Sequence, residues 1–171
     1  MNLLLSDIAL PISLPRKKEN QYIDLSKLKI KNCVGCFGCW VKTPGKCVIR
    51  DDATKVYPLI AKSEKIIYVT HLYCGSYDVT MKTLLERAIP IQQAFIRLHD
   101  KETHHVQRDV VEKDAVILAY GAELEEEKKV FEQLVERNAK NMSFKSWKIH
   151  FVMEKELNEV IVREVMAWEN C

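Results

Sequence analysis

The feature that most restricts the fold of this chain is the alternation of short, fully apolar runs with longer stretches of helical period. The apolar runs lie at residues 2–5, 65–70, 115–120 and 148–152, and a weaker one lies at residues 22–25. They lack the alternation of apolar and polar residues that a sheet with one wet face shows, so we predict strands that are buried on both faces. Strands alternating with helices are typical of a doubly wound α/β fold with a parallel sheet.

Helical periodicity occupies residues 51–62, 78–88, 123–141 and 154–168. The connection between the first two strands is different, because only fourteen residues separate Asp7 from Tyr22. A crossover with its helix takes at least about 10–12 residues, and Pro11 and Pro15 interrupt this one. We therefore predict that the first crossover helix is shortened or missing.

Composition sets the broad class of protein. A chain of 171 residues that is 47% hydrophobic is expected to form one domain over residues 1–171. A formal charge of +2 does not favour a nucleic-acid partner, and no apolar run reaches the roughly 20 residues that cross a bilayer. The N-terminus is apolar first and basic afterwards, the reverse of a secretory signal, which predicts a cytoplasmic protein with reduced thiols.

Four of the six cysteines lie close together, at Cys33, Cys36, Cys39 and Cys47. Thiolates at this spacing can hold a [4Fe-4S] cluster, and a single zinc ion would accept the same ligands. A redox-active thiol, or a tight loop of small cysteines packed under the sheet, are the other interpretations. Ligands of doubly wound sheets bind beyond the carboxyl ends of the strands. We expect this loop (residues 26–50) there, together with residues 6–21, 71–77 and 120–123.

The second candidate segment is residues 70–82, which follows the central strand. Gly75 permits close backbone approach to a ligand, and Tyr73 and Tyr77 offer planar faces for stacking. Without further context these residues also describe an ordinary turn with two aromatic side chains.

Two stretches resemble a known family. CVGCFGCWVKTPGKCVIRDD (residues 33–52) and THLYCGSYDVTMKTLLER (residues 70–87) are similar to the cysteine segment and the flavin loop of flavodoxin-like NAD(P)H-dependent FMN reductases and their iron–sulfur flavoprotein relatives. His71 and Glu86 stand where that family usually has proline and aspartate. The resemblance implies a five-stranded parallel sheet of order 2-1-3-4-5, FMN across the strand ends, NAD(P)H as electron donor, a small-molecule or protein electron acceptor, and a homo-oligomer.

The resemblance also implies a set of cofactor-binding residues. Tyr73, Cys74, Gly75, Ser76 and Tyr77 would line the flavin ring, Gly121 would flank its other side, and the first connection would hold the phosphate. That connection offers only two hydroxyl groups, Ser6 and Ser13, and places Asp7 where an anion should bind. The basic run of Arg16, Lys17 and Lys18 is a substitute phosphate clamp or, as we favour, a solvated charge run.

The sequence therefore predicts an FMN-dependent NAD(P)H oxidoreductase with weak or absent FMN binding. Two alternatives stay open: an iron–sulfur electron-transfer flavoprotein with a cluster on Cys33, Cys36, Cys39 and Cys47, and a degenerate, flavin-free binding or assembly module. No residue marks the choice between NADH and NADPH, and no catalytic residue is assigned.

Overall fold

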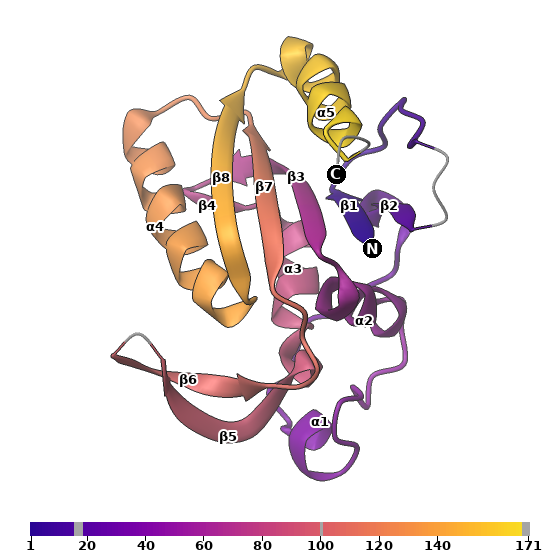
Figure 1. Cartoon of the computed structure of the whole chain (residues 1–171), viewed down its shortest axis with the longest axis vertical. Helices are drawn as coiled ribbons and strands as arrows, with labels where there is room; N and C mark the ends of the chain where they lie inside the picture. Colours follow the sequence, from indigo (N-terminus) through magenta and orange to yellow (C-terminus); the bar gives the residue numbers. More distant parts are fainter. Residues whose placement is uncertain (16–18, 100, 169–171) are drawn as a thin grey trace.

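The computed structural model describes residues 1–15, 19–99 and 101–168 (Figure 1). Its central sheet has five parallel strands in the order β2-β1-β3-β7-β8. These strands are β1 (Asn2–Ser6), β2 (Asn20–Asp24), β3 (Lys65–Tyr73), β7 (Lys113–Tyr120) and β8 (Phe144–Val152). The predicted order 2-1-3-4-5 is confirmed, and with it the flavodoxin-like, doubly wound fold.

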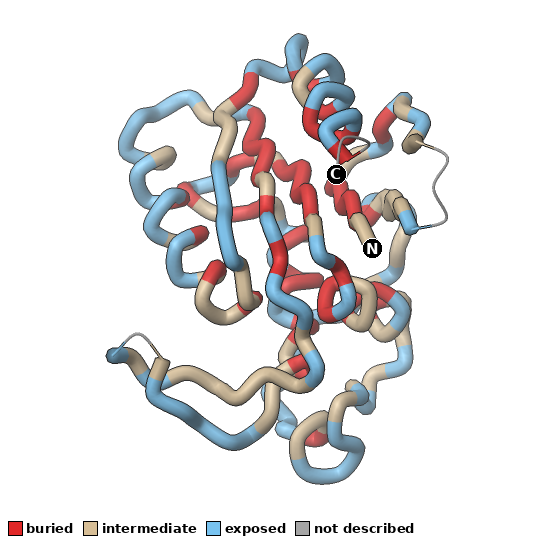
Figure 2. The backbone as a smooth tube through the Cα atoms, viewed as in Figure 1, coloured by how far each residue is buried: buried red, intermediate tan, exposed pale blue. Residues whose placement is uncertain are grey.

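The strands lack alternating polarity because both faces of the sheet are covered. In β3, Ile66, Ile67, Tyr68 and Val69 are all buried, and Figure 2 shows buried residues along the central strands. One face packs against three helices, α2 (Ala53–Lys62), α3 (Val79–Glu86) and α4 (Glu125–Asn141). Removing this apolar surface from water stabilises the fold by about 25 cal/mol per Å².

The other face has one helix, α5 (Leu157–Met166), preceded by the short 3-10 helix η3 (Glu154–Glu156). The remainder of this face is covered by the extended connection that follows β1, whose Ile8, Leu10, Ile12 and Leu14 pack with Leu157 and its neighbours. Residues 7–15 and 19 contain no helix. Within the described residues, an apolar extended segment thus replaces the first crossover helix, as the two prolines predict.

A two-stranded hairpin was not predicted from the sequence. After α3 and the 3-10 turn η2 (Ile89–Ile91), the chain forms β5 (Gln92–His99) and β6 (Glu102–Gln107), which pair with each other and with no strand of the central sheet. The histidines of this hairpin, His99, His104 and His105, are partly buried, and His104 contacts Asn141 of α4.

The cysteine loop (residues 28–50) does not lie where the strand order suggested. After β2 and the 3-10 turn η1 (Leu25–Lys27), it runs to the base of the β5–β6 hairpin, where its short helix α1 (Gly38–Val41) contacts β5 and η2. Figure 1 shows α1 beside the hairpin, at the end of the molecule opposite the tips of β7 and β8. The loop therefore lies near the amino-terminal edge of the sheet. No described helix is long and apolar enough to cross a membrane.

Candidate functional site

At the carboxyl edge of the sheet, Asp7 joins three strands. Its carboxylate accepts hydrogen bonds from the backbone N–H of His71 (2.6 Å), two residues before the end of β3, and from the hydroxyl of Tyr120 (2.9 Å), the last residue of β7. Asp7 is 7% exposed, and burial raises the pKa of its carboxyl group. A buried acidic group therefore occupies the end of β1, and its acceptor oxygens are already satisfied by the protein.

The two predicted hydroxyl donors do not converge at this position. Ser6 is fully buried and its Oγ accepts a hydrogen bond from the N–H of Ile8, whereas Ser13 is exposed on the extended connection. Residues 7–15 and 19 of this connection form no helix whose N-terminus would favour an anion. The described residues therefore do not fit the phosphate of FMN. Arg16, Lys17 and Lys18 lie outside the described residues.

The predicted flavin segment forms a tight hairpin. Strand β4 (Ser76–Tyr77) turns back on β3, so that Leu72 pairs with Tyr77 and Tyr73 with Ser76. Cys74 and Gly75 form the turn with φ of 49° and 68°, a backbone region that favours glycine. A Cβ on Gly75 would lie 2.9 Å from Cγ1 of Val130, so glycine also lets the hairpin pack closely against α4.

The two tyrosines of this segment point to different environments. Tyr73 is 62% exposed at the end of β3. Tyr77 is buried in the core, with its ring 4.9 Å from that of Phe131 in an edge-to-face contact. Gly121 lies against His71 instead, because a Cβ there would lie 2.3 Å from Nε2 of the histidine. Tyr73 and Gly121 thus lie at the carboxyl edge of β3 and β7, whereas Tyr77 points into the core.

The cysteine loop does bring its residues together. Cys33, Cys36, Cys39 and Cys47 line one small apolar cavity, which is completed by side chains from the same loop and by Ile89. Cys33 and Cys36 are exposed, while Cys39 and Cys47 are half-buried. Burial, with the neighbouring thiols, raises the pKa of the Cys39 thiol. All four cysteines therefore line one cavity, and each is a free thiol.

Local contacts fold this loop tightly. The N–H of Gly45 donates to the carbonyl of Cys39 (3.0 Å), and the N–H of Cys47 donates to the hydroxyl of Tyr57 on α2 (3.1 Å). Trp40 packs on His105 of the β5–β6 hairpin, with ring centroids 4.7 Å apart. The thiols are therefore carried on a backbone that is attached to α2 on one side and to the hairpin on the other.

Arg87, directly after α3, holds the stems of the cysteine loop. It is 1% exposed, and its two terminal nitrogens bond both carboxylate oxygens of Asp51 (2.7 and 2.9 Å). They also donate to the carbonyl of Lys31 before the cysteines (2.6 Å) and to that of Ile49 after them (3.2 Å). The sequence placed Arg87 at the end of the family-like stretch of residues 70–87 and Asp51 at the start of a helical segment, and it predicted no contact between them.

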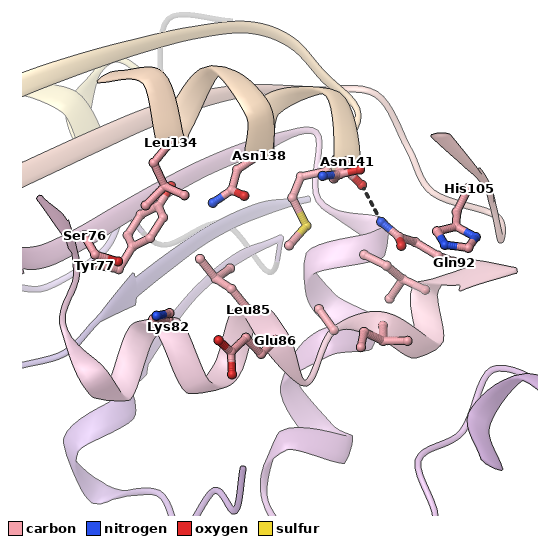
Figure 3. A pocket seen from close by; sticks show the side chains of 14 residues that line it. Ser76, Tyr77, Lys82, Leu85, Glu86, Gln92, His105, Leu134, Asn138 and Asn141 are labelled. Carbon is pink, nitrogen blue, oxygen red and sulfur yellow. Dashed lines mark hydrogen bonds between the residues drawn. The ribbon is translucent and has the colours of Figure 1, made fainter. Parts of the chain in front are cut away.

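A second hollow, of about 380 Å³, lies between α3 and α4 (Figure 3). Ser76 and Tyr77, predicted to face a flavin, line this hollow, together with Lys82 of α3 and Asn138 of α4. Gln92 closes one end by donating to the carbonyl of Asn141 (3.1 Å). Ile89 lines both this hollow and the cysteine cavity, so the two spaces lie on either side of one side chain.

The cysteine cavity offers four thiols as ligands for a metal centre. Within residues 1–15, 19–99 and 101–168, no three His, Cys, Asp or Glu side chains converge closely enough to hold a metal ion. The four thiols instead surround a cavity, which is the arrangement that a cluster of several irons needs. Two buried N–H groups nearby, Nε of Arg87 and Nε1 of Trp40, have no hydrogen-bond acceptor among the described residues. A thiol set with unsatisfied donors beside it fits an anionic iron–sulfur cluster.

Comparisons with known proteins agree with the fold and with the resemblance to iron–sulfur flavoproteins. The chain is 30% identical over 77 residues to an iron–sulfur flavoprotein of Methanocaldococcus jannaschii, which covers 45% of this chain and 39% of that protein. It is 33% identical over 72 residues to an iron–sulfur flavoprotein of Archaeoglobus fulgidus, and this match covers 42% of this chain and 32% of that protein. The resemblance to iron–sulfur flavoproteins is confirmed. The matched part is less than half of the length of these relatives, and no family model matches the chain.

Solved structures show the same fold over almost the whole chain. An NAD(P)H:quinone oxidoreductase from Methanothermobacter marburgensis superposes with a TM-score of 0.60 at 12% identity, covering 96% of this chain and 95% of that one. An FMN-dependent NADH-azoreductase from Bacillus anthracis, solved with FMN, gives 0.56 at 11% identity, covering 96% and 94%. At these identities the likeness shows a flavodoxin-like fold.

Proposed function

We propose that this chain is a redox protein whose electron-carrying group is an iron–sulfur cluster, of the [4Fe-4S] type, held by Cys33, Cys36, Cys39 and Cys47. The observation that carries the proposal is the single cavity lined by all four thiols. Such a cluster supplies one-electron transfer when it is bound. Its thiolate ligands require a reducing compartment, in keeping with a cytoplasmic protein.

The protein's own residues would bind, tune and shield this group. The four cysteines would supply the ligands, and the apolar side chains of Val34, Phe37 and Val48 line the same cavity. Exposure of Cys33 and Cys36 leaves one side open to a small-molecule or protein electron acceptor. A hydrophobic shell with selective access of this kind is what controls the potential of a buried metal centre.

An FMN-dependent NAD(P)H oxidoreductase is the second candidate. The exposed ring of Tyr73 and the likeness in fold to flavin enzymes favour it. The Asp7 carboxylate at the end of β1 opposes it, because the described part of that edge offers the phosphate no set of donors. We therefore expect FMN to bind weakly.

Anaerobic reconstitution with Fe(II) and sulfide tests the proposal. Wild-type protein should take up iron and sulfide, absorb broadly in the visible range, and give an electron paramagnetic resonance signal on reduction. Cys36→Ser should lose most of this iron. Cys74→Ser is the matched control, because Cys74 is an exposed cysteine on the β3–β4 turn, and it should bind iron like wild type.

Three outcomes separate the candidates. Stoichiometric iron and sulfide that depend on Cys36 support the cluster. A yellow protein that releases stoichiometric FMN on denaturation, without iron, supports the flavin oxidoreductase. Protein that stays colourless and free of iron after reconstitution contradicts both and favours the flavin-free module.

A further inference from the structure

The cysteine loop has no secondary structure of its own apart from the single turn α1, so something must hold its shape. One side chain, that of Arg87, contacts both stems of the loop. Arg87 bonds Lys31 before the cysteines, and Ile49 and Asp51 after them. A guanidinium group can do this because it presents five donors in a rigid fork.

The same fork reaches a thiol. Nη2 of Arg87 lies 3.4 Å from Sγ of Cys47, within hydrogen-bond distance for sulfur. Because Arg87 is 1% exposed, water does not compete for this contact. Hydrogen bonds to ligand sulfur are among the features that set the potential of an iron–sulfur cluster.

Asp51 balances the charge of Arg87. Its carboxylate is bidentate with the guanidinium and also accepts from the N–H of Lys31 (2.8 Å). Nη2 of Arg87 therefore donates both to Cys47 and to the Asp51 carboxylate, and Nη1 donates to the other carboxylate oxygen. Removing either partner leaves the other buried and unpaired, so the two substitutions have opposite electrostatic effects at the sulfur.

We infer that Arg87 is the positioning residue of the cysteine loop: it clamps both stems, donates a hydrogen bond to the sulfur of Cys47, and thereby raises the reduction potential of the bound cluster. The clamp stands on the geometry of this chain alone, whereas the effect on potential rests on the proposed iron–sulfur function. Two experiments therefore test the two parts separately.

The clamp is tested in metal-free protein by amide hydrogen exchange, with Arg87→Lys, Arg87→Gln and Lys82→Gln compared with wild type. Lys82 lies on the exposed side of α3, the helix that Arg87 follows, so Lys82→Gln removes a positive charge without changing any contact of the loop. Lysine cannot reproduce the fork. Both Arg87 variants should exchange residues 28–50 roughly tenfold faster or more, with β3 and the control unchanged. If either Arg87 variant exchanges the amides of residues 28–50 at the wild-type rate, the clamp is overturned.

The effect on potential is tested by redox titration of reconstituted protein. Arg87→Gln should lower the reduction potential and Asp51→Asn should raise it, each by about tenfold in the reduction equilibrium, or 59 mV for one electron. A purely structural role predicts shifts of the same sign. If both variants shift the reduction potential in the same direction, or if neither shifts it, the effect of Arg87 on the potential is overturned. Loss of the cluster from Arg87→Gln while β3 keeps its exchange protection supports positioning. If wild type itself takes up no cluster, the proposed function fails and the exchange experiment still decides the clamp.

Discussion

At the carboxyl edge of the sheet, a single hydrogen bond links two strands that are not neighbours. The Tyr120 hydroxyl donates to the buried Asp7 carboxylate, and this contact ties β7 to β1 across the intervening β3. Tyr120→Phe leaves the carboxylate with one donor fewer in a buried position, so we expect a loss of about 1–3 kcal/mol in the free energy of unfolding. Urea denaturation measures it. Tyr73→Phe, at an exposed ring, should change stability by less than about 0.5 kcal/mol; equal losses in both variants would contradict the role of Asp7.

Lys113 is a second buried polar residue with a measurable consequence. It is 1% exposed, its Nζ donates to the carbonyls of Val111 and Met142, and burial lowers its pKa to about 8. Between pH 8 and 10.5 the unfolded chain holds a proton that the folded protein lacks, so stability should rise with pH across this window. Over this window the free energy of unfolding should rise by about 3 kcal/mol. In Lys113→Met the rise should disappear, and the difference between the two proteins across the window isolates this group. A parallel pH dependence in both would refute the assignment.

At the scale of elements, β5 is the surface strand most suited to self-association. Phe95, Ile96 and Leu98 are between 65% and 77% exposed, and among the described residues the strand that pairs with β5 is β6, so β5 forms an edge of a two-stranded sheet with apolar side chains on its surface. We propose that this edge contributes to the expected homo-oligomer. If the wild-type protein is oligomeric in analytical ultracentrifugation, Ile96→Lys should sediment as a monomer. Thr103→Lys, at the exposed residue of β6, should sediment like wild type. Wild-type protein that is monomeric at every concentration would remove the proposal.

The same hairpin shows why some elements were predictable and others were not. The inner strands β1, β3 and β7 are largely buried on both faces, so their composition alone marks them, whereas the edge strands β2 and β8 are mostly half-buried or exposed. The core of β5 has exposed side chains on both faces, and its pairing comes from the local turn to β6. A pattern of apolar burial therefore carries no signal for it. The missing first helix was predictable for the opposite reason, since two prolines and a short connection act locally.

At the scale of the whole molecule, the position of the cysteine loop depends on contacts that are distant in sequence. Arg87 reaches Asp51 across 36 residues, and Trp40 packs on His105 from another element. These contacts draw the loop to the hairpin end, away from the carboxyl edge where strand order alone would place it. The identity of the four thiols was evident from their spacing, but their location and the clamp were not.

The two ends of the molecule thus have separate roles, which a flavin titration can distinguish. If Asp7 closes the phosphate position, the phosphate of FMN adds nothing to binding. FMN and riboflavin should then bind with affinities within about threefold of each other, whereas a working phosphate site with charge-assisted hydrogen bonds would favour FMN by about tenfold or more. Fluorescence quenching of each flavin measures both affinities. FMN binding tenfold tighter than riboflavin would mean that residues outside the described edge hold the phosphate, and the flavin oxidoreductase would become the leading function.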